Sequence, residues 1–167
     1  MSTPAPEVVR EDIRFLGRVL GRVIAQQEGE DVFDLVGVLA LQGGVEEHLR
    51  ILDGLGVDTR RVRLPQDLDG LDGLILPGGE SSAIDKLARA FGVAEPLRHT
   101  QLPVLATCAG LIYSARDLVN PAPGQQTLGL VDVTVRRNAF GNQRFSEERT
   151  VPVALGEGTL EVEASFI

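Results

Sequence analysis

The sequence predicts an α/β fold built on a doubly wound, mostly parallel sheet. Short, continuous apolar runs occur along the chain, and most are followed by a turn of small or polar residues and an amphipathic helix pattern. A continuous apolar run is typical of a strand that is buried on both faces of a parallel sheet. Strands that alternate with helices in this way indicate a sheet covered by helices on both faces.

Four strands and the helices between them make up the expected centre of the fold. The strands are predicted at 36–41, 57–64, 73–76 and 104–105, and the helices at 45–55, 84–91, 94–98 and directly after Cys108, with a polar loop at 65–71. Beyond Leu118 the pattern changes to a Pro/Gly loop at 120–126 and to strands at 130–136, 150–155 and 159–166. Residues 156–158 are expected to form the turn between the last two strands.

The first 35 residues differ from the rest of the chain. A loose tail is expected at 1–7, and apolar residues at helical spacing from Val9 to Ile24 predict an amphipathic helix. The segment at 9–36 resembles the N-terminal helix of phosphoenolpyruvate carboxylase, but it contains none of that enzyme's catalytic residues. We therefore expect two unrelated coding segments, with a foreign N-terminal part at 1–35 and a second unit at 36–167.

Composition excludes several classes of protein. The 167 residues carry a net charge of −8, with 43% hydrophobic and 24% charged residues, which is normal for a soluble domain and argues against nucleic acid as a partner. Cys108 is the single cysteine and there are only two histidines, so neither a disulfide framework nor a structural zinc site is expected. No apolar run reaches bilayer length and no signal-peptide pattern occurs. We expect an acidic, cytoplasmic protein with no membrane contact, metal or other cofactor.

The strongest candidate for a reactive group is Cys108. It lies between the apolar run 102–106 and a helix pattern starting at Ala109, as in a strand–nucleophile–helix turn. A helix beginning there directs its N-terminal dipole and free N–H groups at the sulfur, which favours the thiolate. The alternative is a buried core cysteine. Gln42 and residues 78–82 also follow predicted strands, and such ends share one edge of a parallel sheet, so the convergence of three loops favours a catalytic role.

Several motifs in residues 36–167 occur together, in the order and spacing of a known family. They are Gly37–Gly43, Glu47-His48, Leu76–Ser81, Thr107–Ile112, and Arg137–Gly141 with Gln143. On these motifs the segment resembles the glutaminase subunits of pyridoxal 5′-phosphate synthase, within the triad-type (class I) glutamine amidotransferases of flavodoxin-like fold. The resemblance implies hydrolysis of L-glutamine to glutamate and ammonia through a cysteine thioester. It also implies a partner synthase that uses the ammonia to make the vitamin B6 cofactor.

The resemblance and the chemistry assign roles to individual residues. Cys108 would be the nucleophile, and the backbone N–H groups of Gly79 and Ala109 would stabilise the oxyanion. The substrate would be held by residues carried over from the family motif: Gly79, Glu80, Ser81, Arg137, which would pair with the α-carboxylate, and Ile167. Two alternatives stay open. Arg137 could be an ordinary residue at a surface strand end, and Glu80 could cap a helix, a role that is compatible with substrate binding.

Two features depart from the family pattern. Ala106 replaces the glycine usually found two positions before the nucleophile, which adds a methyl group to a tight turn. The family's general base is a histidine in a His-Pro-Glu segment near its C-terminus, and Ile167 comes before any such segment. Neither His48 nor His99 matches this base. We therefore expect a fold that is incomplete at its C-terminus and a glutaminase activity that is impaired or absent, because general-base catalysis contributes about 10²–10⁴-fold.

More than one function is compatible with these motifs. The first is a glutaminase subunit, and the alternatives are a non-catalytic remnant that binds glutamine or the synthase, and an unstable chimeric fragment. A different cysteine hydrolase of α/β fold is disfavoured by the motif Pro77–Ser81. Ammonia release that depends on Cys108 would separate the first from the others, and cooperative unfolding would separate the second from the third.

Overall fold

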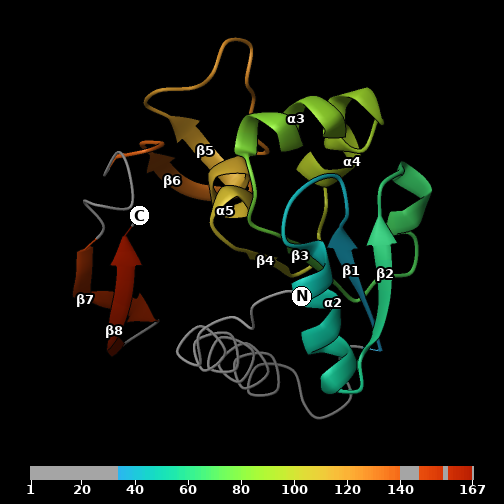
Figure 1. Ribbon diagram of the computed structural model, residues 1–167, viewed down its shortest axis with the longest axis horizontal. Helices are drawn as coiled ribbons and strands as arrows, with labels where there is room; N and C mark the ends of the chain where they lie inside the picture. The colour runs from blue at the N-terminus through green and yellow to red at the C-terminus, as the bar shows by residue number, and fades with distance from the viewer. Residues whose placement is uncertain (1–33, 140–146, 156–157, 167) are drawn as a thin grey trace, which may run out of the picture.

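A four-stranded parallel sheet forms the centre of the protein. The computed structural model describes residues 34–139, 147–155 and 158–166 (Figure 1). Strands β1 (Leu35–Leu39), β2 (Asp58–Val62), β3 (Gly73–Leu76) and β4 (Val104–Ala106) pair in the order β2-β1-β3-β4. The four predicted strands are confirmed, whereas the helix predicted at the N-terminus lies outside the described residues.

Helices cover both faces of this sheet. Helix α2 (Val45–Gly54) lies on one face, and α3 (Ser81–Ala90), α4 (Ala94–Arg98) and α5 (Ala109–Ser114) lie on the other (Figure 1). Helix α3 begins at Ser81 rather than at the predicted Ile84 because the Glu80 carboxylate accepts the N–H groups of Ser82 and Ala83. The doubly wound arrangement predicted from the sequence is therefore present.

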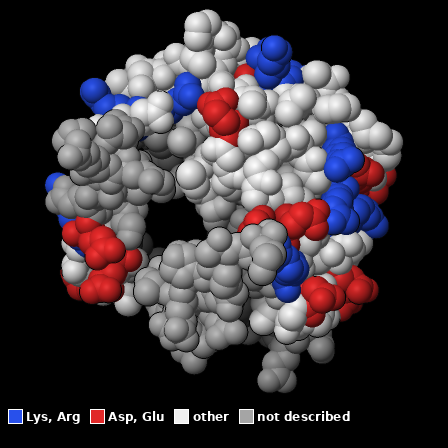
Figure 2. All heavy atoms as spheres, in the orientation of Figure 1, with Lys and Arg blue, Asp and Glu red and all other residues white. Residues whose placement is uncertain are grey.

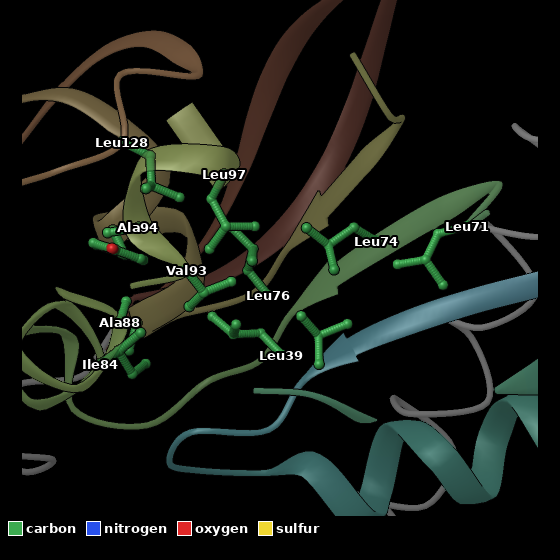
Figure 3. Close-up of a cluster of buried hydrophobic side chains, with 13 residues drawn as sticks. Leu39, Leu71, Leu74, Leu76, Ile84, Ala88, Val93, Ala94, Leu97 and Leu128 are labelled. Carbon is green, nitrogen blue, oxygen red and sulfur yellow. The ribbon is translucent and has the colours of Figure 1, made fainter. Parts of the chain in front are cut away.

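The core is divided by the sheet into two clusters. Val38 of β1 and Ile75 of β3 point to the face of α2, where they pack with Leu49 and Leu52. Alternate residues of the same strands point to the opposite face and join the larger cluster in Figure 3, which includes Leu39, Leu74, Leu76, Ile84, Ala88, Val93, Leu97 and Tyr113. Because both faces of β1 and β3 are buried, their sequences read as continuous apolar runs.

Two further strand pairs lie outside the central sheet. Strands β5 (Ala115–Leu118) and β6 (Val131–Val135) are parallel, and β7 (Glu147–Leu155) and β8 (Gly158–Phe166) form the predicted antiparallel pair. Strand β5 was not predicted, since it follows α5 without a turn residue. Residues 65–71 were expected to form a polar loop, whereas Pro65–Leu68 form a 3₁₀ turn. The alternation at 130–136 predicts one buried face, but Val131 and Val133 are 39% and 37% exposed.

A buried carboxylate fixes the loop between β5 and β6 against α3. Asp85 is fully buried and accepts hydrogen bonds from Nε and Nη2 of Arg89 at 3.1 and 2.9 Å. The same carboxylate accepts the backbone N–H of Gln126 at 3.0 Å. Because an unpaired buried charge costs several kcal/mol, the carboxylate is paired within α3 by Arg89, and the bond from Gln126 holds the loop against the helix.

Surface charges are mixed. Acidic and basic side chains are interspersed over the described part of the face in Figure 2. Typical exposed pairs are Arg61 with Glu46 at 2.7 Å and Arg98 with Glu95 at 3.1 Å. Such pairs contribute about 0–1 kcal/mol each, so stability depends mainly on the core. None of the described helices is long and apolar enough to cross a membrane.

Replacing Leu97 tests the larger cluster. Leu97 is fully buried, so Leu97→Ala is expected to lower the free energy of unfolding by about 2–5 kcal/mol, because it removes apolar contacts and leaves a cavity. Leu55 is 53% exposed, and Leu55→Ala is the matched control, with an expected change within about 0.5 kcal/mol. Urea denaturation of both variants checks this, and equal effects would contradict the assignment of Leu97 to the core.

Candidate active site

Three loops meet at the carboxyl edge of the central sheet, as the sequence predicted. The loop after β1 contacts the loop after β3, since the N–H of Gly44 donates to the carbonyl of Gly78 at 3.0 Å. The N–H of Glu80 donates to Oε1 of Gln42 at 2.7 Å. Strands β1 and β3 are neighbours whose following helices lie on opposite faces. In doubly wound sheets this is the point where ligands bind.

Glycines allow these loops to approach closely. Gly43 has φ +103°, and a Cβ atom at this position would collide with the carbonyl of Gly78. A Cβ atom on Gly78 would lie 3.3 Å from Cβ of Cys108 and 4.0 Å from its Sγ. The three loops therefore stack in contact, with Gly78 between the loop after β1 and the cysteine.

Cys108 has the backbone expected of a nucleophile at a strand-to-helix turn. It follows β4, precedes α5 and has φ 48° and ψ −111°, values that an L-residue rarely adopts. Such a conformation costs about 1–3 kcal/mol and is found mainly at functional sites. Cys108 is also exposed, so the alternative of a buried core cysteine is wrong.

Two backbone N–H groups are free close to the cysteine along the chain or next to Gly78, the residue that lies against it. The N–H groups of Gly79 and Ala109 have no acceptor among the hydrogen bonds of the described residues, whereas Gly110 donates to the carbonyl of Thr107 at 2.8 Å. Gly79 belongs to the loop that contacts Gln42, and Ala109 is the first residue of α5. Free N–H groups beside a nucleophile are suited to stabilising an oxyanion.

Glu80 combines two structural roles. Its carboxylate caps α3 by accepting the N–H groups of Ser82 and Ala83 at 3.2 and 2.8 Å, so the capping alternative is confirmed. It also forms an ion pair with Nη2 of Arg137 at 2.9 Å. The hydroxyl of Ser82, which donates at 2.6 Å, contributes most to holding the pKa of Glu80 below its ordinary value, with the backbone N–H groups and Arg137 adding to it against the opposing effect of burial. Glu80 is thus a carboxylate held in its charged form.

Both the backbone and the side chain of Arg137 are held by hydrogen bonds. Its side chain is 14% exposed, so it is not an ordinary residue of a surface strand end. The carboxamide of Asn120 accepts the backbone N–H of Arg137 at 2.7 Å and donates to its carbonyl at 2.8 Å. At the other end, Nη1 donates to Oε1 of Gln125 at 2.7 Å. The arginine therefore points from the end of β6 toward the first turn of α3.

Ser81 is hydrogen-bonded to the group formed by Glu80, Arg137 and Gln125, which we call the charged cluster. It is 2% exposed, and its hydroxyl accepts a hydrogen bond from Nε2 of Gln125 at 3.1 Å. The sequence analysis did not single out Asn120 or Gln125. Both lie at the borders of a loop rich in proline and glycine, where no periodicity marks a residue as functional.

His48 lies closer to the nucleophile than the sequence suggests. Its Nε2 is 3.4 Å from Oγ1 of Thr107, the residue before Cys108. Burial of the imidazole holds the pKa of His48 below its ordinary value, and the neighbouring carboxylate of Glu47 only partly opposes this. Burial therefore favours the neutral imidazole. His99, in contrast, pairs with Glu95 at the exposed end of α4.

Ala106 and Ile167 are the remaining positions that the sequence singled out. Ala106 pairs with Leu76 in the sheet, and it packs against the larger core cluster, so its extra methyl group is accommodated. Ile167 lies outside the described residues. Within the described ranges, no group of three or more His, Cys, Asp or Glu side chains could hold a metal ion.

Comparison with known families decides which kind of α/β protein this is. The model of the SNO glutamine amidotransferase family matches residues 38–167. The chain belongs to this family. A solved structure described as "Crystal structure of glutamine amidotransferase" shares the fold with a TM-score of 0.63 and 42% sequence identity, covering 77% of this chain and 69% of that one. The resemblance of residues 36–167 to the glutamine amidotransferases and the class I, flavodoxin-like fold expected from the sequence are confirmed.

Two curated relatives have the same protein name. The pyridoxal 5′-phosphate synthase subunit PdxT of Corynebacterium glutamicum (strain R) is 64% identical over 137 residues, which cover 80% of this chain and 68% of the relative. The protein of the same name from Cutibacterium acnes is 58% identical over 137 residues, which cover 80% of this chain and 67% of the relative. The chain thus spans about two thirds of the length of these relatives.

The partly buried imidazole of His48 makes the stability of the folded chain depend on pH. Since the pKa of His48 is lower in the folded than in the unfolded chain, the unfolded state binds more protons below about pH 6.5, and stability should fall as the pH decreases through this range. Urea denaturation at pH 7.5 and 5.5 should show this loss in the wild type and a smaller loss in His48→Gln. An unchanged loss in His48→Gln would contradict the assignment.

Proposed function

We propose that the chain acts on L-glutamine as the glutaminase subunit of a pyridoxal 5′-phosphate synthase. The observation that carries this proposal is the positive-φ turn that presents Cys108 beside Gly78, next to two free backbone donors. A strained, exposed cysteine between strand and helix is suited to attack on a carbonyl carbon. The relatives are named as subunits of pyridoxal 5′-phosphate synthase, which fits the transfer of ammonia to a partner synthase that the resemblance implies.

The proposed reaction proceeds through a thioester. Sγ of Cys108 attacks the carboxamide carbon, a C–S bond forms and the carbonyl electron pair moves to oxygen, where the N–H groups of Gly79 and Ala109 donate to it. Collapse of this intermediate breaks the C–N bond, and the nitrogen leaves as ammonia after it gains a proton. Water then attacks the thioester carbon, releases glutamate and restores the thiol. Each oxyanion donor of this kind is worth about 10²–10³-fold in rate.

The charged cluster supplies the remaining contacts in this proposal. Arg137 would pair with the α-carboxylate, since a guanidinium can hold a carboxylate through two parallel hydrogen bonds. Glu80 and Gly79 would contact the substrate from the loop after β3. Ser81 has a buried hydroxyl, so its contact would come from the backbone. We retain Ile167 as a proposed contact on the resemblance alone.

The proposal assigns no residue as the general base of the reaction. The two histidines of the sequence are His48, which lies beside Thr107, and His99, which pairs with Glu95. Neither occupies a His-Pro-Glu segment, so we propose that this chain alone turns over slowly or not at all. We also retain the division into a foreign segment at 1–35 and an amidotransferase unit at 36–167. A non-catalytic module that binds glutamine or the synthase is the second candidate, favoured by the same lack of a base, and an unstable chimeric fragment is the third.

A glutamine analogue tests the nucleophile without requiring turnover. 6-Diazo-5-oxo-L-norleucine carries a diazoketone in place of the carboxamide, and we expect it to alkylate Cys108 in the wild type, with protection by excess L-glutamine. Mass spectrometry of the intact chain and its peptides measures the label. Cys108→Ala should remain unlabelled, and ammonia release, measured with and without a synthase partner, should be lost in this variant. Labelling that L-glutamine does not slow, or ammonia release unchanged in Cys108→Ala, would contradict the proposed role.

A further inference from the structure

Gln125 connects the two sides of the charged cluster. Its Oε1 accepts hydrogen bonds from Nη1 of Arg137 at 2.7 Å and from the backbone N–H of Ala122 at 3.0 Å. Its Nε2 donates to Oγ of Ser81 at 3.1 Å. Both partners of Oε1 can only donate, so the orientation of the carboxamide is fixed by its neighbours. One neutral side chain thus joins Arg137 to the first residue of α3.

The position of Gln125 is itself well determined. The next residue, Gln126, donates its backbone N–H to the fully buried carboxylate of Asp85 at 3.0 Å. Asp85 also holds Arg89, whose Nη2 donates to the carbonyl of Gly124 at 3.2 Å. The residues on both sides of Gln125 are therefore hydrogen-bonded to α3. This fixes the backbone from which the carboxamide reaches Arg137.

The guanidinium of Arg137 keeps N–H donors that an additional anion could use. Glu80 already neutralises the guanidinium through Nη2, and Gln125 satisfies one N–H of Nη1 without adding charge. A guanidinium has five N–H donors, so donors remain for a bidentate contact with a carboxylate. A second carboxylate at position 125 would give the cluster a net negative charge and repel an incoming anion.

We propose that Gln125 is a positioning residue that orients the guanidinium of Arg137 without neutralising it, and so sets the preference of the site for ligands with a free α-carboxylate. This inference rests on the proposed function, in which Arg137 pairs with the α-carboxylate of glutamine. Gln125 acts through Arg137 and Ser81 and touches no reacting atom.

Selectivity between two ligands tests the proposal. L-Glutamine and L-glutaminamide have the same shape, but the second carries a neutral carboxamide in place of the α-carboxylate. Isothermal titration calorimetry gives the Kd of each ligand for the wild type and for Gln125→Glu. The variant side chain can still accept from Arg137 and Ala122, so the fold should be retained. We expect the preference of the wild type for L-glutamine over L-glutaminamide to fall by about tenfold in Gln125→Glu, which corresponds to about 1.4 kcal/mol.

The neighbouring residue provides a matched control. Gln126→Glu makes the same change in charge one position along the chain, where the side chain pairs with Arg98 at 2.7 Å instead of Arg137. This variant should keep the wild-type selectivity. Gln125→Ala removes the acceptor without adding charge, and it should also lower the selectivity because the guanidinium loses its orientation. Circular dichroism melts establish that each variant is folded.

Each outcome has a defined meaning. A wild type that binds neither ligand overturns the proposed function and this inference with it. A wild type that prefers L-glutamine, with the same preference in Gln125→Glu and Gln125→Ala, overturns this inference alone. Equal weakening of both ligands in the two Gln125 variants would indicate a purely structural role and would also overturn it.

Discussion

The close contact between Gly43 and Gly78 is the constraint on which the candidate site depends. It brings the loop after β1 against the loop after β3, and the hydrogen bond from Gly44 to Gly78 secures this approach. Gly78 in turn lies against Cys108, since a Cβ atom on Gly78 would be 3.3 Å from Cβ of Cys108. A side chain at Gly43 would separate the two loops, because the carbonyl of Gly78 already occupies that space.

The unusual backbone of Cys108 is tolerated because both of its flanks are fixed. Thr107 before it donates its N–H to the carbonyl of Leu76 at 3.0 Å, and Ala109 after it starts a helix whose Tyr113 is fully buried. A residue in a rare conformation persists when its surroundings determine it from several directions. The sheet edge and α5 provide these directions here.

The candidate site has two parts, and each is held in position by a different region of the fold. The cysteine and the backbone donors belong to loops that leave the central sheet, which is covered on both faces. The cluster of Glu80, Arg137 and Gln125 depends on the segment between β5 and the end of β6, and this segment is fixed to α3 through the buried Asp85. Precise placement of a charged group therefore depends on a buried charge that takes no direct part in the site.

Much of this arrangement could be predicted from the sequence, because the relevant signals are local. Continuous apolar runs located β1, β3 and β4, and a lone cysteine between small residues located the nucleophilic turn. The roles of Asn120 and Gln125 could not be predicted, since each depends on a partner that is distant in the chain and is brought near only by the fold. The contact of His48 with Thr107 could not be predicted for the same reason, since it joins residues from different elements. Strand β5 was missed because α5 leads into it without a residue that ends a helix.

The double role of Glu80 couples the charged cluster to local motions of the helix behind it. The same carboxylate that faces Arg137 accepts the N–H groups of Ser82 and Ala83, so any change in its pairing also alters the protection of these two amides. Amide hydrogen exchange follows local opening, and the first turn of a helix opens more readily than its centre. Ser82 and Ala83 are therefore spectroscopic reporters of the charge state of the cluster, readable at two backbone positions without a chemical label.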